Sequence, residues 1–136
     1  MHYTYQINHD YKMINVITKG DLIIKELAPM ELKISKIAKQ LKYKIIYDYR
    51  LSKNRISMAE AYFWFSDLYD KVDWELRKIP LAYLGNKEDW EFYLFFECTS
   101  VNKGFPIKVF QEEMPSQNGL TINEYLLALD IHNKKI

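Results

Sequence analysis

The sequence predicts a single α/β domain over residues 1–136, built on a mainly parallel sheet. Short apolar runs alternate with segments of helical period, and this alternation is typical of parallel strands joined by right-handed helical crossovers. The length suits one domain. All four glycines fall where one predicted element ends: Gly20, Gly85, Gly104 and Gly119. We therefore expect the order β-β-α-β-α-β-α-β-α, with the N-terminal strand pairing antiparallel at one edge.

The chain opens with a predicted hairpin. Apolar and polar side chains alternate over residues 3–7, as in a strand with one buried face. Residues 8–10, Asn-His-Asp, are a turn signal, and a second strand-like run covers residues 11–18. Two such runs joined by a short turn favour an antiparallel pair, and Gly20 should end the second strand.

A helix and a buried strand follow. Apolar residues from Leu27 to Leu41 recur every three or four positions, which is the spacing of an amphipathic helix. Proline is tolerated in the first helical turn, so Pro29 predicts a helix that begins near Glu26 or just after it. Residues 43–48 form a continuous apolar run that ends in Asp48, which is typical of a strand buried on both faces.

The second half of the chain repeats this pattern. Ser57 and Glu60 have the spacing of a capping box, so a second helix should start there. Residues 79–84 form another buried strand. We expect Asn86 to cap a third helix, and Gly104 to end it.

The predicted elements end with a strand and a helix. The last strand covers residues 105–110, and residues 111–119 form the longest irregular segment. A second capping box at residues 121–124 begins the last helix.

Composition and charge exclude several classes of function. A net charge of +1 gives no basic surface for nucleic acid. No apolar run is long enough for a membrane span, and the N-terminus has no secretion signal. Cys98 is the single cysteine, which fits a reducing compartment, so we expect a cytoplasmic protein. No spacing of His and Cys indicates a metal, and no glycine-rich loop indicates a phosphate cofactor. We expect no cofactor and no catalytic constellation.

Three kinds of side chain are candidates for chemistry. Asp48 ends a central strand, where open α/β sheets bind ligands. The alternative is a structural role, in which Asp48 accepts hydrogen bonds from loop amides or pairs with Arg50 or Arg55. Cys98 lies beside apolar residues, and we expect it to be a small buried side chain. The histidines are expected at the surface.

Aromatic residues make up 15% of the chain and crowd the second and third helices. These aromatic residues are too many to fit on the single apolar stripe of an ordinary surface helix. Three explanations remain open: packing on two sides, a subunit interface, or a pocket for an apolar ligand. Trp64, Phe92 and Phe96 would line such a pocket.

Three segments carry a resemblance to a known family: residues 16–22 (Val-Ile-Thr-Lys-Gly-Asp-Leu), residues 45–50 (Ile-Ile-Tyr-Asp-Tyr-Arg) and residues 107–110 (Ile-Lys-Val-Phe). Together they resemble the STAS-like, or anti-sigma-factor-antagonist-like, domains of bacterial regulatory proteins. The resemblance implies a phosphorylatable serine in an Asp-Ser-Ser-Gly segment after the central strand. Here Asp48 precedes Tyr-Arg-Leu, so that switch is missing, although Ser52 and Ser57 lie nearby.

Three hypotheses about function follow. The first is a non-enzymatic regulatory or protein-interaction module that self-associates as a homodimer, with a partner surface near Asp48, Arg50 and Ser57. The second is a carrier or sensor of a small apolar or lipid-like ligand, held by Trp64, Phe92 and Phe96. The third is an enzyme that uses Asp48.

Overall fold

The structure is a computed structural model that describes residues 1–71, 78–105 and 107–111. These residues form one α/β domain with a mixed sheet. In chain order the elements are β1 (His2–Asn8), β2 (Met13–Leu22), α1 (Ile24–Leu41), β3 (Lys44–Asp48), β4 (Ser52–Asn54), α2 (Met58–Lys71), β5 (Leu81–Gly85), α3 (Trp90–Asn102) and β6 (Ile107–Gln111). The predicted order is confirmed as far as β6, with β4 as an additional strand. The first residue of the predicted irregular segment 111–119 belongs to β6; the rest of that segment and the predicted last helix lie outside the described residues.

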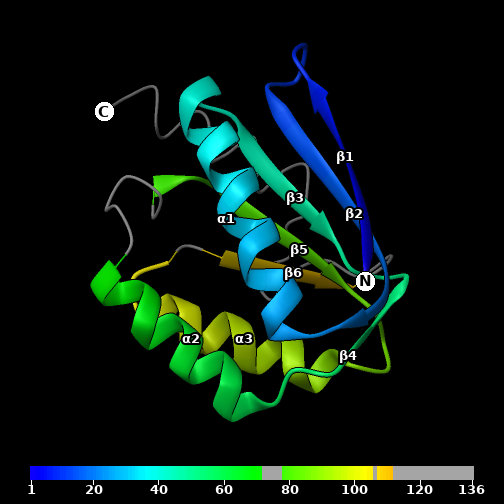
Figure 1. Ribbon diagram of the computed structural model, residues 1–136, viewed down its shortest axis with the longest axis vertical. Helices are drawn as coiled ribbons and strands as arrows, with labels where there is room; N and C mark the ends of the chain where they lie inside the picture. The colour runs from blue at the N-terminus through cyan, green and yellow to red at the C-terminus, as the bar shows by residue number, and fades with distance from the viewer. Residues whose placement is uncertain (72–77, 106, 112–136) are drawn as a thin grey trace.

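The order of the strands in the sheet is close to their order in the chain. Its strand order is β1-β2-β3-β5-β6, and β4 pairs with the end of β2. β1 runs antiparallel to β2, whereas the other pairs are parallel. This confirms a mainly parallel sheet in which the N-terminal strand is antiparallel. Figure 1 shows α1 running in front of the sheet and α2 lying along α3.

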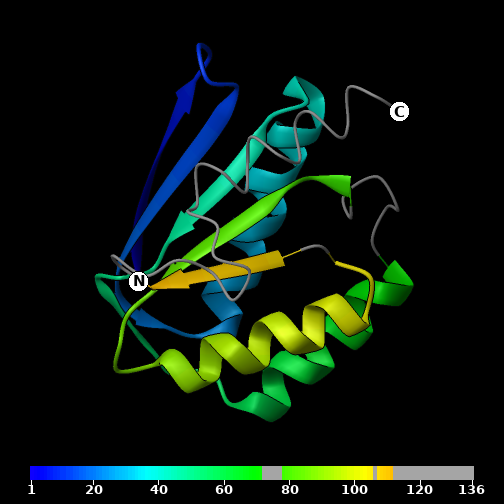
Figure 2. The same ribbon diagram turned by 180° about the vertical axis from the view of Figure 1, so that it is seen from behind.

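Among the described residues, the crossovers from β2 to β3, from β3 to β5 and from β5 to β6 all step in the same direction across the sheet. Right-handed connections of this kind place their helices on one face. Seen from behind, the strands lie in front of α1 (Figure 2). The helix-facing side chains include a row in register across four strands: Val16, Tyr47, Tyr83 and Val109, all buried. They belong to the main hydrophobic core, to which α1, α2 and α3 also contribute.

The opposite face of the sheet has its own small core. Ile46, Ala82 and Phe110 are buried there, with Met13 and Leu84 packed against them. Alternate residues of β3 and β5 are therefore buried on both faces, as predicted from their continuous apolar runs.

The start of α1 differs from the prediction. The helix begins at Ile24 rather than near Glu26, because the Ile23 carbonyl already accepts hydrogen bonds from the N–H groups of Glu26 (3.1 Å) and Leu27 (2.9 Å). Pro29 consequently lies inside the helix and leaves one carbonyl without its usual donor. The ring is on the exposed side of the helix, where water can satisfy that carbonyl.

The start of α3 differs from the prediction, whereas its end agrees with the prediction. The helix begins at Trp90, so Asn86 does not cap it; the Asn86 side chain instead accepts the Asp89 N–H at 2.7 Å and closes the preceding turn. The predicted end is confirmed. Gly104 has a φ of 85°, and the Phe105 N–H donates to the Ser100 carbonyl at 2.9 Å, which is the hydrogen bond of a Schellman motif.

The predicted capping box of α2 is confirmed. The Glu60 N–H donates to Ser57 Oγ at 3.1 Å, and the Ser57 N–H donates to Glu60 Oε1 at 3.0 Å. Each side chain thus satisfies a backbone donor at the start of the helix. The second predicted box lies outside the described residues.

Candidate functional site

A small cavity lies between the start of α1, β4, α2 and α3. Its volume is about 10 Å³, and its accessible wall is apolar. The residues that line it are Leu22, Ile24, Leu27, Tyr49, Asn54, Ile56, Ala61, Trp64, Tyr83, Phe92, Tyr93 and Phe96. The three residues predicted to line an apolar pocket are therefore together in this wall.

Aromatic rings make up one side of the cavity. Phe96 stacks on Trp64, with 6.5 Å between ring centroids, and meets Tyr83 edge to face at 5.0 Å. Phe92 lies 6.0 Å from Phe96. Trp64 and Phe92 are only half-buried, whereas Tyr83 and Phe96 are buried. The half-buried rings form the outer part of the wall, and the buried ones form its base.

Tyr93 is held against the sheet by an unusually close approach to Gly85. A Cβ atom at position 85 would lie 2.7 Å from Cε2 of Tyr93, closer than two carbons can approach. Glycine is therefore required where the ring crosses β5. The Tyr93 side chain is 1% exposed, and its hydroxyl has no hydrogen-bond partner among the described residues. Burying a hydroxyl without a partner is unfavourable, so this one calls for an explanation.

A buried carboxyl group lies behind the cavity. Glu31 of α1 is 7% exposed and accepts hydrogen bonds from Tyr49 Oη to Oε2 (2.6 Å) and from Tyr83 Oη to Oε1 (2.7 Å). Tyr47 Oη donates to the Glu31 backbone carbonyl at 3.4 Å. Tyr47 and Tyr83 stack at 5.0 Å. Two rings of the cavity wall, Tyr49 and Tyr83, are thus anchored by one carboxyl group.

Burial changes the acid–base properties of this cluster. Desolvation raises the pKa of Glu31 to about 7, although the hydrogen bonds from Tyr49 and Tyr83 act in the opposite direction. Burial, followed by the negative charge of Glu31, raises the pKa of Tyr47, Tyr49 and Tyr83 well above the usual value. The three hydroxyls therefore stay protonated and act as donors.

Sequence reasoning missed Glu31. A signal was present, because Glu31 stands between Leu27 and Ile34 on the apolar stripe of α1. A charged residue at a core position of an amphipathic helix is rarely buried without a partner. Its partners, Tyr49 and Tyr83, lie far along the chain, and only the fold brings them together.

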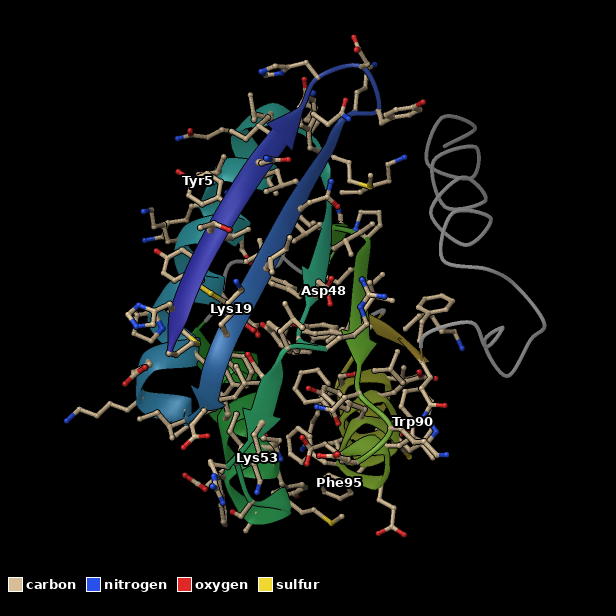
Figure 3. The ribbon with its side chains drawn as sticks, turned by 90° about the vertical axis from the view of Figure 1, so that its right-hand side faces the viewer. Tyr5, Lys19, Asp48, Lys53, Trp90 and Phe95 are labelled. Carbon is tan, nitrogen blue, oxygen red and sulfur yellow. The ribbon has the colours of Figure 1, made fainter. Side chains whose placement is uncertain are left out.

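Asp48 has the structural role that the sequence left as an alternative. Its carboxylate forms a bidentate pair with Arg50, Nε to Oδ1 at 2.9 Å and Nη2 to Oδ2 at 2.8 Å. Oδ1 also accepts the Arg50 N–H at 3.1 Å. Figure 3 shows Asp48 at the end of β3, at a distance from Trp90 and Phe95 of α3. Asp48 and Arg50 are outside the cavity wall, so the predicted site residues divide into two groups.

The hydroxyl groups of both serines near Asp48 form hydrogen bonds that are part of the fold. Ser52 is 3% exposed, and its hydroxyl lies 2.6 Å from that of Thr18. A kinase needs an accessible hydroxyl, so Ser52 is poorly placed for phosphorylation. Ser57 is exposed, but its hydroxyl caps α2.

The prediction for Cys98 is wrong, since this residue is exposed. Tyr93, Phe96 and Ser100 occupy the buried side of α3, and position 98 falls on the other side. His2 and His9 are exposed as predicted, and His9 Nδ1 lies 2.7 Å from Tyr43 Oη. His132 lies outside the described residues.

The crowded aromatics of α3 are accounted for largely by packing on two sides. Trp90, Phe92, Leu94 and Phe95 are half-buried, and all pack against the main core. The helix contacts α2 on one side and β6 on the other. This agrees with the first of the three explanations left open by the sequence.

Among the described residues, no group of three or more His, Cys, Asp or Glu side chains is placed to hold a metal ion. Within the described helices, none combines the length and the apolar character that crossing a membrane would need.

Comparison with models of protein families and with curated protein sequences gives no match to this chain. The resemblance to the STAS-like domains therefore stays a prediction, and the class that the structure defines is an α/β domain with a mixed sheet.

Proposed function

We propose that this protein is a non-enzymatic binding module that carries or senses a small apolar ligand in the cavity between α1, α2 and α3. The observation that carries the proposal is the convergence of Trp64, Phe92 and Phe96 on one apolar wall. Ligand sites are typically concave and mostly apolar, with a few placed polar groups. Here the accessible wall is apolar, and the polar groups lie behind it, where the hydroxyls of Tyr49 and Tyr83 donate to Glu31.

Binding requires the outer wall to move. A cavity of about 10 Å³ has room for about one water molecule, so any organic ligand must displace side chains. The half-buried Trp64 and Phe92 are the residues suited to move, because Tyr49 and Tyr83 are fixed by Glu31. The anchored rings would keep the base of the site in place while the outer wall opens.

Native mass spectrometry of protein purified gently from cells tests this proposal. We expect an adduct of a few hundred daltons that is lost on denaturation. Extraction of the ligand should also shift tryptophan emission, since Trp64 is part of the wall. A Trp64→Phe variant provides the control, because it should lose most of the shift while keeping the adduct. Protein without any adduct, and without an emission change on adding apolar compounds, would contradict the proposal.

A second candidate is a regulatory module that acts through protein contacts, including self-association as a homodimer. The observation that favours it is a group of exposed apolar side chains on α2: Met58, Tyr62 and Phe63, of which Phe63 is 65% exposed. Tyr62 and Phe63 meet edge to face at 5.6 Å. Exposed aromatic side chains are frequent at interfaces.

Sedimentation over a dilution series distinguishes the second candidate from the first. We expect a self-associating protein to dissociate on dilution, and Phe63→Asp to weaken that association. Thr4→Asp, a change on β1 away from α2, is the matched control. A monomer at every concentration would remove the homodimer, and the exposed rings would then need another partner.

A further inference from the structure

We infer that the outer edge of β1 is a docking site for an extended segment of another protein, which joins the sheet as a further strand and places an acidic side chain beside Lys33. This edge is separate from the cavity between α1, α2 and α3, so the inference goes beyond the proposed function. The partner is defined by its chemistry, as an extended segment whose apolar and acidic side chains share one face.

The first argument is the open edge. β1 is the first strand in the order of the sheet, and among the described strands it pairs only with β2. The residues of β1, His2–Asn8, pair with consecutive residues of β2, so β1 contains no bulge. In an antiparallel pair every second residue points its N–H and C=O groups away from the neighbour. These groups can form a ladder with one more strand.

The second argument is that this edge lacks the usual protection. Natural proteins commonly block exposed edges with lysine, proline or a bulge. The sequence of β1, His-Tyr-Thr-Tyr-Gln-Ile-Asn, contains no proline and no Asp, Glu, Lys or Arg. Residues 4–7 are exposed in succession. A long uncharged edge favours aggregation unless a partner covers it, so the composition of β1 indicates an edge that is kept open for pairing.

The third argument is the apolar face of the same strand. Tyr5 pairs with Val16, whose side chain faces the helices. Tyr3 and Ile7 share that side with Tyr5, because side chains alternate along a strand. Figure 3 shows β1 as the outermost strand, with Tyr5 on the side of α1. Tyr3 packs against the main core, whereas Tyr5 and Ile7 are each 36% exposed. Apolar side chains of an added strand would cover these two.

The fourth argument is the positive charge beside this face. Lys33 Nζ lies 5.6 Å from the centroid of the Tyr5 ring and 6.0 Å from that of Tyr3. Lys33 is exposed and forms no salt bridge with a described residue. None of the positions three or four residues away on α1 is acidic. An acidic side chain on the helix side of the added strand would therefore complement Lys33.

The same charge argues against a second copy of this chain as the occupant. β1 of another copy has no acidic side chain to place beside Lys33. A symmetric antiparallel pair of β1 strands would also bring both Lys33 side chains to the same side of the joined sheet, where like charges repel. A segment of another protein with an acidic side chain fits this edge better.

The test uses two blocked, dye-labelled peptides of the same length as β1: Thr-Val-Thr-Glu-Thr-Val-Thr, and the same sequence with Lys in place of Glu. In an extended strand both peptides place the valines and the charged residue on one face. Fluorescence anisotropy gives their affinities for the wild type, Lys33→Glu and the control Lys53→Glu. The control makes the same charge change on β4, far from Tyr5 in Figure 3.

We expect the wild type to prefer the Glu peptide. In Lys33→Glu the ratio of the two affinities should shift toward the Lys peptide by about tenfold, whereas Lys53→Glu should keep a ratio close to that of the wild type. Hydrogen exchange then locates the peptide. The Glu peptide should slow exchange at the β1 amides that point away from β2, and should leave exchange in α2 unchanged.

Four results would overturn the inference. The first is binding of the Glu peptide to the wild type that is weaker than about 1 mM. The second is a ratio that Lys33→Glu leaves unchanged, or that Lys53→Glu shifts equally. The third is slowed exchange that is absent from β1. The fourth is slow exchange of the β1 amides without peptide that depends on protein concentration, because a second copy would then occupy the edge.

Discussion

Tyr83 Oη donates a hydrogen bond of 2.7 Å to Oε1 of Glu31, a residue 52 positions earlier in the chain. The contact joins the middle of the sheet to α1 and fixes one ring of the cavity wall. It also buries a carboxyl group in an aromatic environment, where its ionisation is unfavourable.

Glu31 should therefore make stability depend on pH. Its pKa is about 7 in the folded protein, against 4.5 for an unperturbed glutamate. At a pH between these two pKa values, Glu31 is protonated more often in the folded state than in the unfolded state. Its contribution to stability is therefore fully present at pH below about 4.5 and is lost as pH rises through about 7. We expect a loss of about 3 kcal/mol over this range.

The measurement is urea unfolding from about pH 4.5 to about pH 8. Glu31→Gln, which has no ionisable group at this position, should show a flatter profile, while Glu88→Gln, a change at an exposed residue, should keep the wild-type slope. Parallel profiles for wild type and Glu31→Gln would show that Glu31 does not titrate in this range.

The capping box of α2 gives a prediction about helix stability. Ser57→Ala removes the acceptor of the Glu60 N–H and should lower the free energy of unfolding by about 1 kcal/mol. Ser57→Thr keeps a hydroxyl in place and should lose much less. Chemical denaturation of the three proteins gives the comparison. If Ala and Thr behave alike, the hydroxyl contributes nothing at this helix end.

Gly85 should tolerate no larger residue while Tyr93 lies against it. Gly85→Ala would force the new methyl group into the Tyr93 ring and should cost about 1–3 kcal/mol. In a Tyr93→Ala background the same change should cost much less, because the clash is gone. A double-mutant cycle measures this coupling. Additive effects would mean that the ring and the β5 backbone are not in contact.

The pair between Asp48 and Arg50 should contribute modestly to stability. Asp48→Asn breaks a partly buried bidentate interaction, and we expect a loss of about 1 kcal/mol. Asp21→Asn is the control, since Asp21 lies 3.5 Å from Arg55 Nε in a pair that is more than half exposed. That change should have almost no effect on thermal melting. Equal losses in the two variants would argue against a special role for the bidentate geometry.

Periodicity was enough to predict most elements of this fold. The continuous apolar runs of β3 and β5 and the three-to-four spacing of α1 depend on local pattern, which the sequence displays directly. β4 was missed because Ser52, Lys53 and Asn54 are polar and show no alternation. Their pairing depends on the continuation of β2 past Gly20, which no local signal reveals.

The candidate site was predicted only in part. Trp64, Phe92 and Phe96 could be grouped because a surplus of aromatics on two successive helices is visible in the sequence. The polar side of the site could not be predicted, because Glu31 of α1 acquires its role from Tyr49, which follows β3, and from Tyr83 of β5. The state of Tyr93 depends on a backbone approach at Gly85, which is a property of the assembled structure.

The strand order has a consequence for how the chain acquires its structure. In the series β2, β3, β5 and β6, each strand lies in the sheet beside the strand that comes before it in the series. During synthesis a newly made strand and its crossover helix can dock on a sheet that already exists, without waiting for a later segment. Contacts that are close in sequence lower the entropic barrier to folding. The exception is the Glu31 cluster, which is completed only after β5 has joined, so the base of the cavity is a late product of assembly.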